Sequence, residues 1–176
     1  MLKLIDPDKK YLVDYRDAYF KTLEKYKEGK IKKHNIMFLN TDEIDVIQKY
    51  TDMRDATKLK LGYVPCYHYF LVDEDKFIGE IGIRIRLTEA LLQYGGNIGY
   101  CINPTYWRKG YGTKILELGL EKAKVLVNDN KVLITCDDDN IGSYKIIEKN
   151  GGILENKVLN KADGETFLTR RYWIKF

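Results

Sequence analysis

Residues 98–123, IGYCINPTYWRKGYGTKILELGLEKA, contain the pattern that decides the fold of this chain. Asn97 to Asn103 is expected to form a strand, and Pro104 to Lys109 a loop. From Gly110 onward the apolar residues recur at helical spacing. The expected apolar face of this helix contains Leu116, Leu120, Ala123 and Val127. The segment therefore predicts a strand that leads through a glycine loop into a helix.

The loop and the first helical turn combine two glycines with several positive charges. Gly110 and Gly112 let the backbone approach a ligand closely and leave the unpaired N–H groups of the helix N-terminus open to an anion. The helix dipole adds roughly half a positive charge, and Arg108, Lys109 and Lys114 add whole charges. The pattern favours a phosphate-bearing ligand. A tight turn without a ligand is the alternative interpretation.

Two common phosphate-binding loops do not fit the spacing. A Walker loop needs a Gly-Lys-Ser/Thr ending four residues after an earlier glycine, and the chain has no such ending. The dinucleotide-binding fingerprint needs a third glycine at the position of Ile115. The predicted phosphate ligand therefore belongs to neither of these two classes.

Downstream of this helix, the sequence alternates between strand and helix patterns. Lys131 to Cys136 predicts a buried strand, and Asn140 caps a helix that runs to about Lys149 and stops at Gly151-Gly152. Two last strands are expected near Ile153–Leu159 and Glu165–Lys175, joined by a turn that contains Asp163-Gly164. This order implies a parallel pair inside a mixed sheet.

The first half reads mainly as helix and then as a hairpin. Helical spacing runs from Tyr11 to Tyr26, and a second helix is expected to start near Asn40 or Thr41. Strands are expected at Tyr67–Asp73 and Phe77–Leu87. In the second of them, period-two alternation places Glu80, Arg84 and Arg86 on one face.

Composition excludes several classes of protein. The chain has 176 residues, and its 30 Lys+Arg against 26 Asp+Glu give a net charge of +4 with both signs mixed throughout. No apolar run is long enough for a bilayer, and no secretory leader is expected. Three cysteines are too few for a disulfide framework, and their spacing is not that of a zinc site. We expect one cytoplasmic domain over residues 1–176.

The segment 98–123, followed by VLITCDDDNIGSYKIIEKNGG at 132–152, resembles the GNAT superfamily of acyl-CoA-dependent N-acetyltransferases, and more closely the predicted acetyltransferases of low-GC Gram-positive bacteria. The resemblance extends from about Tyr69 to Trp173. It implies an α/β (α+β) fold whose mixed, mostly antiparallel sheet of about seven strands has a central parallel pair and helices on both faces. It also implies acetyl-CoA as cosubstrate and no metal.

The resemblance assigns residues to the cofactor. Backbone groups of the strand would pair with the pantetheine arm like an added strand, and the amides of the loop would hold the pyrophosphate. Asn140 would contact the pantetheine from the far side, and a plain helix cap is its alternative role. The cofactor-binding residues expected in this way are Tyr100, Cys101, Ile102, Arg108, Lys109, Gly110, Tyr111, Gly112, Thr113, Asn140 and Ser143.

The chain departs from the family pattern at two positions. Trp107 stands where the family has Arg or Gln, and Arg108 is expected to supply the charge instead. Ile147 stands where many members carry a tyrosine that protonates the departing thiolate. Tyr144 lies on nearly the same helical face and is a candidate substitute; the alternative is an aromatic residue packed in the core.

An attacking amine must also lose its proton. An amine with a pKa of about 10.4 is neutral about once in 2,500 at pH 7, which costs about 4.6 kcal/mol. Glu80, acting through water, is the preferred base, with a solvated strand face as the alternative. Asp137 is second, and His68 reads as a packed histidine. Cys136 as an acyl carrier is disfavoured because a buried cysteine usually fills apolar space.

These features predict direct acyl transfer to a primary amine on a small molecule or a peptide, by a monomer or homodimer. A non-catalytic acyl-CoA-binding or sensing module is the alternative, motivated by Trp107 and Ile147. Nucleic-acid binding is disfavoured because basic and acidic residues are interleaved, and no membrane partner is expected. Asp137-Asp138-Asp139 are expected either to attract a cationic amine or to be a solvated loop.

Overall fold

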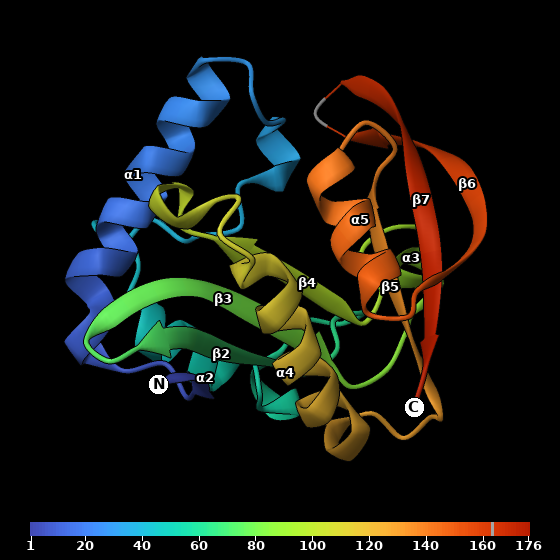
Figure 1. Ribbon diagram of the computed structural model, residues 1–176. Coiled ribbons are helices and arrows are strands. Elements are labelled where there is room, and N and C mark those ends of the chain that lie inside the picture. Colours follow the sequence, from blue (N-terminus) through green and yellow to red (C-terminus); the bar gives the residue numbers. More distant parts are fainter. Residues whose placement is uncertain (163) are drawn as a thin grey trace.

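The computed structural model describes residues 1–162 and 164–176, and Asp163 of the expected final turn lies outside the described residues. Seven strands form one sheet in the order β1-β2-β3-β4-β5-β7-β6 (Figure 1). Their bounds are β1 Leu2–Ile5, β2 Cys66–Asp73, β3 Lys76–Arg84, β4 Ile98–Ile102, β5 Lys131–Asp137, β6 Ile153–Ala162 and β7 Glu165–Lys175. All neighbours are antiparallel except β4 and β5, which are parallel. The predicted mixed sheet with a central parallel pair is confirmed.

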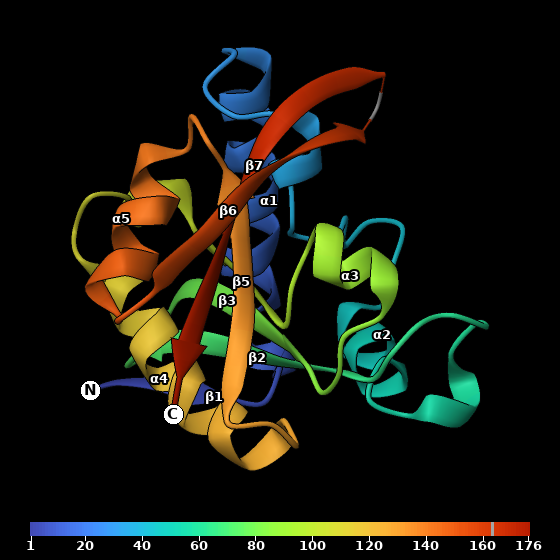
Figure 2. The ribbon, with the colours of Figure 1, turned by 90° about the vertical axis from the view of Figure 1, so that its right-hand side faces the viewer.

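Helices cover both faces of the sheet, as predicted (Figures 1 and 2). The α-helices are α1 Leu12–Lys27, α2 Val46–Asp52, α3 Glu89–Gln93, α4 Tyr111–Leu126 and α5 Ile141–Lys149. Short 3-10 turns lie at Lys9–Tyr11, Lys33–Asn35, Ala56–Lys58 and Pro104–Tyr106. Among the described residues, no helix is long and apolar enough to cross a membrane.

Two apolar clusters, one on each face, hold these layers together. One joins α4 and α5 to the sheet through fully buried residues such as Leu116 and Ile147. The other joins α1 and α2 to the opposite face through an aromatic group that contains Tyr15, Tyr50 and Phe70. Because successive side chains of a strand point to opposite faces, β2 and β3 are buried on both sides.

This two-sided burial corrects the reading of the hairpin as a solvated face. Glu80 is only 1% exposed, because α1 and α2 cover the face on which it lies. The strand ends at Arg84, so Arg86 lies beyond it. Alternation of apolar and charged residues is typical of a half-exposed strand, and here a single buried carboxylate produces the same pattern.

Two further boundaries differ from the prediction. Helix α2 begins at Val46 and is capped by Asp45, whose side chain accepts a hydrogen bond from the backbone N–H of Gln48. Asn40 instead organises a preceding turn, in which its side chain accepts from the N–H of Asp42. The N-terminal strand β1 was not predicted, because its four residues are too few for a periodic signal.

The inner face of α4 provides a test of the packing. Leu116 is fully buried, whereas Val125 on the same helix is 85% exposed. We expect Leu116→Ala to lower the free energy of unfolding by about 2–5 kcal/mol, because it leaves a cavity in the core. The matched control Val125→Ala should change it by less than about 0.5 kcal/mol. Urea unfolding followed by circular dichroism measures both, and equal losses would contradict this assignment of the buried face.

Candidate functional site

Strands β4 and β5 pair at a single position and then separate. Ile98 opposes Ile134, and this is the one registered pair between the two strands in the described part of the chain. Asn97 secures the junction, since its N–H donates to the carbonyl of Leu133 at 2.7 Å and its side-chain oxygen accepts from the N–H of Leu133 at 2.9 Å. Beyond this clamp, β4 has a partner on the β3 side only.

The register with β3 decides which backbone groups of β4 face the gap. The N–H of Arg84 donates to the carbonyl of Asn97, and the N–H of Asn103 donates to the carbonyl of Ile78. In an antiparallel ladder every second residue bonds to the same neighbour, so Cys101 also directs its backbone toward β3. The backbone groups of Tyr100 and Ile102 therefore face the gap, and those of Cys101 do not, which corrects the expected set of three.

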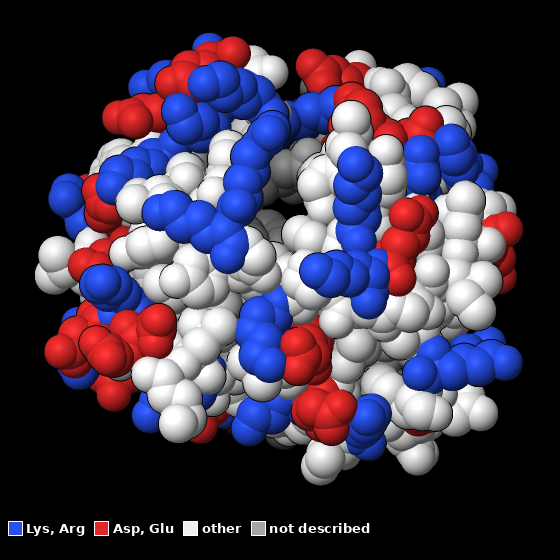
Figure 3. Space-filling view, viewed as in Figure 1, with Lys and Arg blue, Asp and Glu red and all other residues white. Residues whose placement is uncertain are grey.

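A cavity of 430 Å³ occupies this gap and reaches both faces of the sheet. In the space-filling view it lies within a hollow rimmed by Lys and Arg side chains (Figure 3). From α1 and the segment that follows it, the walls are formed by Thr22, Lys30, Ile31, Asn35 and Met37. From the loop before α4, from α4 and from α5, they are formed by Tyr106, Trp107, Arg108, Gly112, Gly142, Ser143 and Ile146. Elements from both faces of the sheet therefore form the walls of one cavity.

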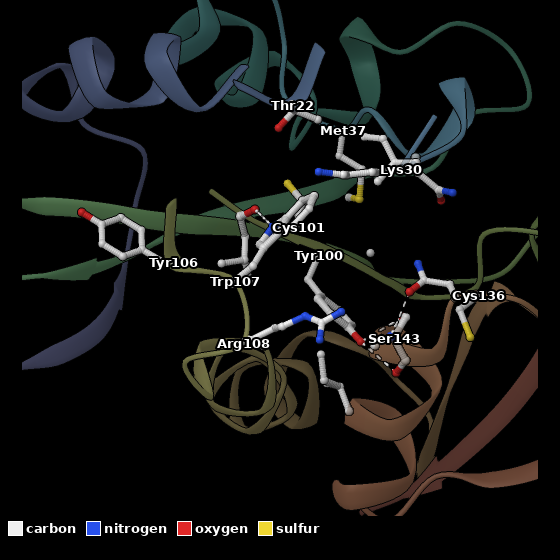
Figure 4. A pocket seen from close by; sticks show the side chains of 18 of the residues that line it. Thr22, Lys30, Met37, Tyr100, Cys101, Tyr106, Trp107, Arg108, Cys136 and Ser143 are labelled. Atoms are coloured by element: carbon white, nitrogen blue, oxygen red, sulfur yellow. Dashed lines mark hydrogen bonds between the residues drawn. The ribbon is translucent and has the colours of Figure 1, made fainter. Parts of the chain in front are cut away.

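The loop before α4 has the backbone geometry that an anion site requires. Gly110 caps the helix with a φ of 85°, and Arg108 also has a positive φ of 59°. A Cβ atom on Gly112 would lie 2.4 Å from the Cδ1 atom of Ile146, so a larger residue would displace the Ile146 side chain between α4 and α5. In Figure 4, the Arg108 side chain lies at the cavity beside Tyr100. The N-terminus of α4 therefore adjoins the cavity.

Trp107, the departure from the family pattern, has a defined structural role. Its indole Nε1–H donates to the carbonyl oxygen of Ile102 at 2.7 Å (Figure 4). This bond satisfies one of the backbone acceptors that face the gap and fixes the indole ring in the cavity wall. The residue thus braces the end of β4 and supplies no positive charge.

Asn140 and Ser143 join the cavity wall at the start of α5. The side-chain oxygen of Asn140 accepts from the N–H of Ser143 at 3.0 Å, and both residues line the cavity. Asn140 therefore serves as a helix cap and remains placed to meet a ligand. The Ser143 hydroxyl lies 3.2 Å from that of Tyr100. These two hydroxyls form a pair at the cavity wall.

Tyr144, the expected substitute acid, is not among the residues that line the cavity in the described chain. Its ring lies against the guanidinium of Arg170, 4.0 Å from the ring centre. Ile147 is fully buried in the core beneath α5. Of the expected cofactor residues, the cavity wall includes Tyr100, Cys101, Ile102, Arg108, Gly112, Asn140 and Ser143, while Lys109, Gly110, Tyr111 and Thr113 lie at the adjoining turn.

Glu80 lies behind Cys101 and not in the cavity wall. Its Oε2 accepts from the Tyr50 hydroxyl at 2.7 Å, and its Oε1 lies 3.9 Å from the Sγ of Cys101. Tyr50 is bonded to the Tyr15 hydroxyl at 2.8 Å, which accepts from the N–H of Leu39. Burial raises the pKa of Glu80 to about 7. The chain of donors ends at a backbone N–H that cannot accept a proton, so Glu80 can exchange its proton only on the Cys101 side.

Asp137, the second expected base, belongs to a cluster that the sequence analysis missed. Its Oδ2 lies 2.9 Å from the Nε2 of His34 and accepts from the side-chain N–H of Asn35 at 2.8 Å. Lys32 approaches the same oxygen at 3.7 Å. His34 and Asn35 lie in a 3-10 turn without a motif, so the one sequence signal was that the chain has only two histidines.

The other two aspartates of this loop are also neutralised. Asp138 forms ion pairs with Arg170 at 2.6 Å and with Lys157 at 2.7 Å. Asp139 pairs with Lys32 at 2.9 Å. The loop therefore does not present the uncompensated negative charge that would attract a cationic amine.

The two thiols at the cavity are poor nucleophiles. Burial raises the pKa of Cys136 to about 12 and raises that of Cys101 well above its usual range. Both therefore stay protonated at neutral pH, whereas the thiolate is the reactive form. Within residues 1–162 and 164–176, no cluster of three His, Cys, Asp or Glu residues could hold a metal ion.

The buried carboxyl of Glu80 predicts a pH dependence of stability. Its pKa is near 4.5 in the unfolded chain and about 7 in the fold. The folded state therefore binds this proton more tightly, and about 3 kcal/mol of stability is lost as the pH rises from 4.5 through 7. We expect Glu80→Gln, which cannot ionise, to lack this loss and to be more stable than the wild type above pH 7.

Urea unfolding of both proteins across this pH range measures the difference. Glu121→Gln is the matched control, because Glu121 is exposed on α4 and should leave the pH dependence unchanged. Parallel curves for the wild type and Glu80→Gln would contradict the raised pKa.

Comparisons with known proteins agree with this geometry. Residues 19–153 match the acetyltransferase (GNAT) domain family. The uncharacterized N-acetyltransferase YnaD of Bacillus subtilis is 33% identical over 81 residues, which cover 46% of this chain and 45% of YnaD. The matched segment therefore spans less than half the length of that relative.

Solved structures share the fold over nearly the whole chain. The ribosomal alpha-N-protein acetyltransferase RimL in complex with coenzyme A has a TM-score of 0.71 at 14% identity, covering 99% of this chain and 93% of RimL. The microcin self-immunity acetyltransferase MccE in complex with acetyl-CoA and AMP has a TM-score of 0.70 at 16% identity, covering 99% and 92%. A GNAT-family acetyltransferase from Bacillus anthracis has a TM-score of 0.68 at 19% identity, covering 99% and 94%.

At these identities, the similarity to solved structures shows the fold alone. The family match covers residues 19–153, which is more than half of the sequence, and it therefore shows the family. The resemblance expected from the glycine loop and Asn140 is confirmed. The chain belongs to the GNAT acetyltransferase family.

Proposed function

We propose that this protein transfers the acetyl group of acetyl-CoA to a primary amine by direct transfer. The observation that carries the proposal is the gap between β4 and β5. In the described residues, the backbone of Tyr100 and the N–H of Ile102 have no strand partner there, and they adjoin the N-terminus of α4. An extended amide chain can pair with such an edge as an added strand, and a diphosphate suits the helix terminus. Acetyl-CoA carries both groups, and RimL and MccE, which share the fold, were solved with coenzyme A or acetyl-CoA.

The residues around the gap fit this cosubstrate. The amides from Arg108 to Thr113 would hold the pyrophosphate, and the carbonyl and N–H groups of Tyr100 would hold the pantetheine, because the Ile102 carbonyl is bonded to Trp107. Asn140 and Ser143 would contact the arm from α5, where both already line the cavity. A bound acetyl-CoA supplies the thioester carbonyl that the amine attacks.

The surrounding side chains favour direct attack over an acyl-enzyme. Cys101 and Cys136 are protonated thiols, so neither is ready to take the acetyl group. The N–H of Ile102 faces the gap and is a candidate to stabilise the oxyanion. The paired hydroxyls of Tyr100 and Ser143 are candidates to protonate the departing thiolate, a role for which Tyr144 lies less favourably.

The wider setting of the activity follows from the same features. We infer that residues 1–176 act as one domain, since one sheet joins strands from both halves of the chain. The three unpaired cysteines are typical of a reducing compartment, which supports a cytoplasmic location. The acceptor is a small-molecule or peptide amine, and the protein acts as a monomer or homodimer.

Calorimetry and a thiol-release assay test the proposed function. We expect acetyl-CoA to bind to the purified protein, and at least one member of a panel of amines, amino acids and peptides to release coenzyme A thiol. The panel should also be run without protein, because thioesters hydrolyse slowly in water. Absence of binding would overturn the proposal, while binding without release on any amine would favour a non-catalytic acyl-CoA-binding module.

The turn before α4 allows a sharper test of the cofactor site. Gly110 and Gly151 have nearly the same positive φ, 85° and 86°, and a Cβ atom would meet open space at both. Valine is strained at such φ values, so Gly110→Val and Gly151→Val should destabilise the fold similarly. Only Gly110→Val should deform the anion-binding turn, and we expect it to raise the acetyl-CoA dissociation constant by about 10-fold or more. Equal affinities in the two variants would argue against this turn as the pyrophosphate site.

A further inference from the structure

We propose that His34, oriented by Asp137, accepts the proton that the acceptor amine loses during acetyl transfer. The inference rests on the proposed function and assigns a residue to its least explained step. The Nε2 atom of His34 lies 2.9 Å from Asp137, and the two side chains are only 8% and 2% exposed. The pair itself lies beside the cavity wall, which includes Asn35, next to His34, and Cys136, next to Asp137.

The His34 ring is held on several sides. It stacks on Phe167 of β7 with ring centres 4.3 Å apart and an interplanar angle of 21°, and it meets the edge of Tyr94 at 6.1 Å. Asn35 donates to the same carboxylate oxygen as His34 and so fixes the position of Asp137. Three separate segments therefore determine the orientation of one imidazole, which is typical of a side chain that must present a chosen nitrogen.

The chemistry of the pair defines which nitrogen is available. A carboxylate only accepts hydrogen bonds, so the Nε2 of neutral His34 carries the proton and Nδ1 keeps its lone pair. Among the described residues, the hydrogen bonds of the His34 ring are made by Nε2, to both oxygens of Asp137. Nδ1 is therefore the nitrogen whose lone pair is available to accept a proton.

The position of the pair suits the second substrate. Asp137 points to the same face of β5 as Thr135, because side chains two apart along a strand share a face, and Thr135 lines the cavity. Asn35 lines it from the neighbouring segment. The α4 terminus, expected to hold the cofactor phosphates, lies across the sheet from this region. An amine that enters from the α1 side would meet this region before it reaches the thioester.

The other candidate bases are less suitable. Glu80 is buried behind Cys101 and does not line the cavity, so it does not reach an acceptor amine there. Burial lowers the pKa of His68 to about 3, and its ring is stacked on Tyr50 at 4.0 Å. Asp137 itself is bonded to His34 and Asn35 and lies 3.7 Å from Lys32, so it acts as a positioning residue.

The proton transfer balances without a further reactant. As the amine nitrogen forms its bond to the carbonyl carbon and the C–S bond breaks, one N–H proton passes to Nδ1 directly or through one water. The imidazolium is stabilised by Asp137 and later releases the proton to solvent, while the thiolate takes a proton of its own. Among the described residues, the charged or titratable groups around His34 are Asp137 of β5, Lys32 and Tyr94, and Lys32 in turn interacts with Asp139 and with Glu165 of β7.

Nitrogen NMR tests the geometry without any acceptor. The chain has two histidines, so long-range proton–nitrogen spectra contain two imidazole systems, and His34→Gln assigns them. We expect neutral His34 as the Nε2–H tautomer in the wild type. Asp137→Asn should shift it toward the Nδ1–H tautomer, because an amide can donate to Nε2. A wild-type Nδ1–H tautomer would overturn the proposal.

Kinetics with acetyl-CoA and the best amine of the panel test the role itself. We expect His34→Gln to lower kcat/KM for the amine by about 100-fold or more at pH 7 and to remove the histidine limb of its pH profile. The dissociation constant for acetyl-CoA should stay within about 2-fold of the wild type. Asp137→Asn should lower kcat/KM in the same direction.

Glu80→Gln separates the two base candidates, and thermal unfolding checks that each variant folds. If Glu80→Gln removes the pH limb while His34→Gln retains it, the inference is wrong and the proposed function stands. If the wild type releases no thiol with any amine, the proposed function and the inference both fail.

Discussion

The parting of β4 from β5 after one residue pair is the constraint on which the rest of the site depends. A sheet interior normally satisfies its backbone groups on both sides, and unpaired groups in a buried strand cost free energy. Here Asn97 closes the junction with two bonds to Leu133, and Trp107 covers the carbonyl of Ile102 at the other end. Between these two contacts, the backbone of Tyr100 has no strand partner among the described residues, so the fold keeps free hydrogen-bonding groups at the centre of the sheet.

Two buried carboxylates flank this opening, and the structure treats them differently. Glu80 is held by neutral partners, with Tyr50 donating to it at 2.7 Å, and no cation of the described residues pairs with it, so burial raises its pKa into the neutral range. Asp137 is as deeply buried but is bonded to His34 and Asn35 and lies near Lys32. The first environment favours a carboxyl that holds its own proton. The second places a carboxyl group in hydrogen bonds that orient the side chain beside it.

The parts of the fold and of the candidate site that the sequence predicted are those whose contacts join residues close together in the chain. The turn from Arg108 to Thr113 and the cap at Asn140 act through backbone amides a few residues away, so a short motif was enough to predict them. The sheet with its parallel pair followed from strand order. The burial of Glu80 was not predictable, because α1 and α2, which cover it, lie at least 28 positions away in the chain. The role of His34 was not predictable, because its partner Asp137 lies 103 positions away in the chain.

The same difference separates the two halves of the cavity. The side toward α4 is built mainly from backbone groups and small residues, whose geometry tolerates many side chains. The side toward α1 is built from side chains of α1, of the segment after it and of β5, which meet only in the folded state. Substitutions there can alter the shape and charge of that wall without disturbing the β4 edge or the α4 terminus. A fold of this kind can keep one cosubstrate while the acceptor changes, and so the acceptor leaves no short motif in the sequence.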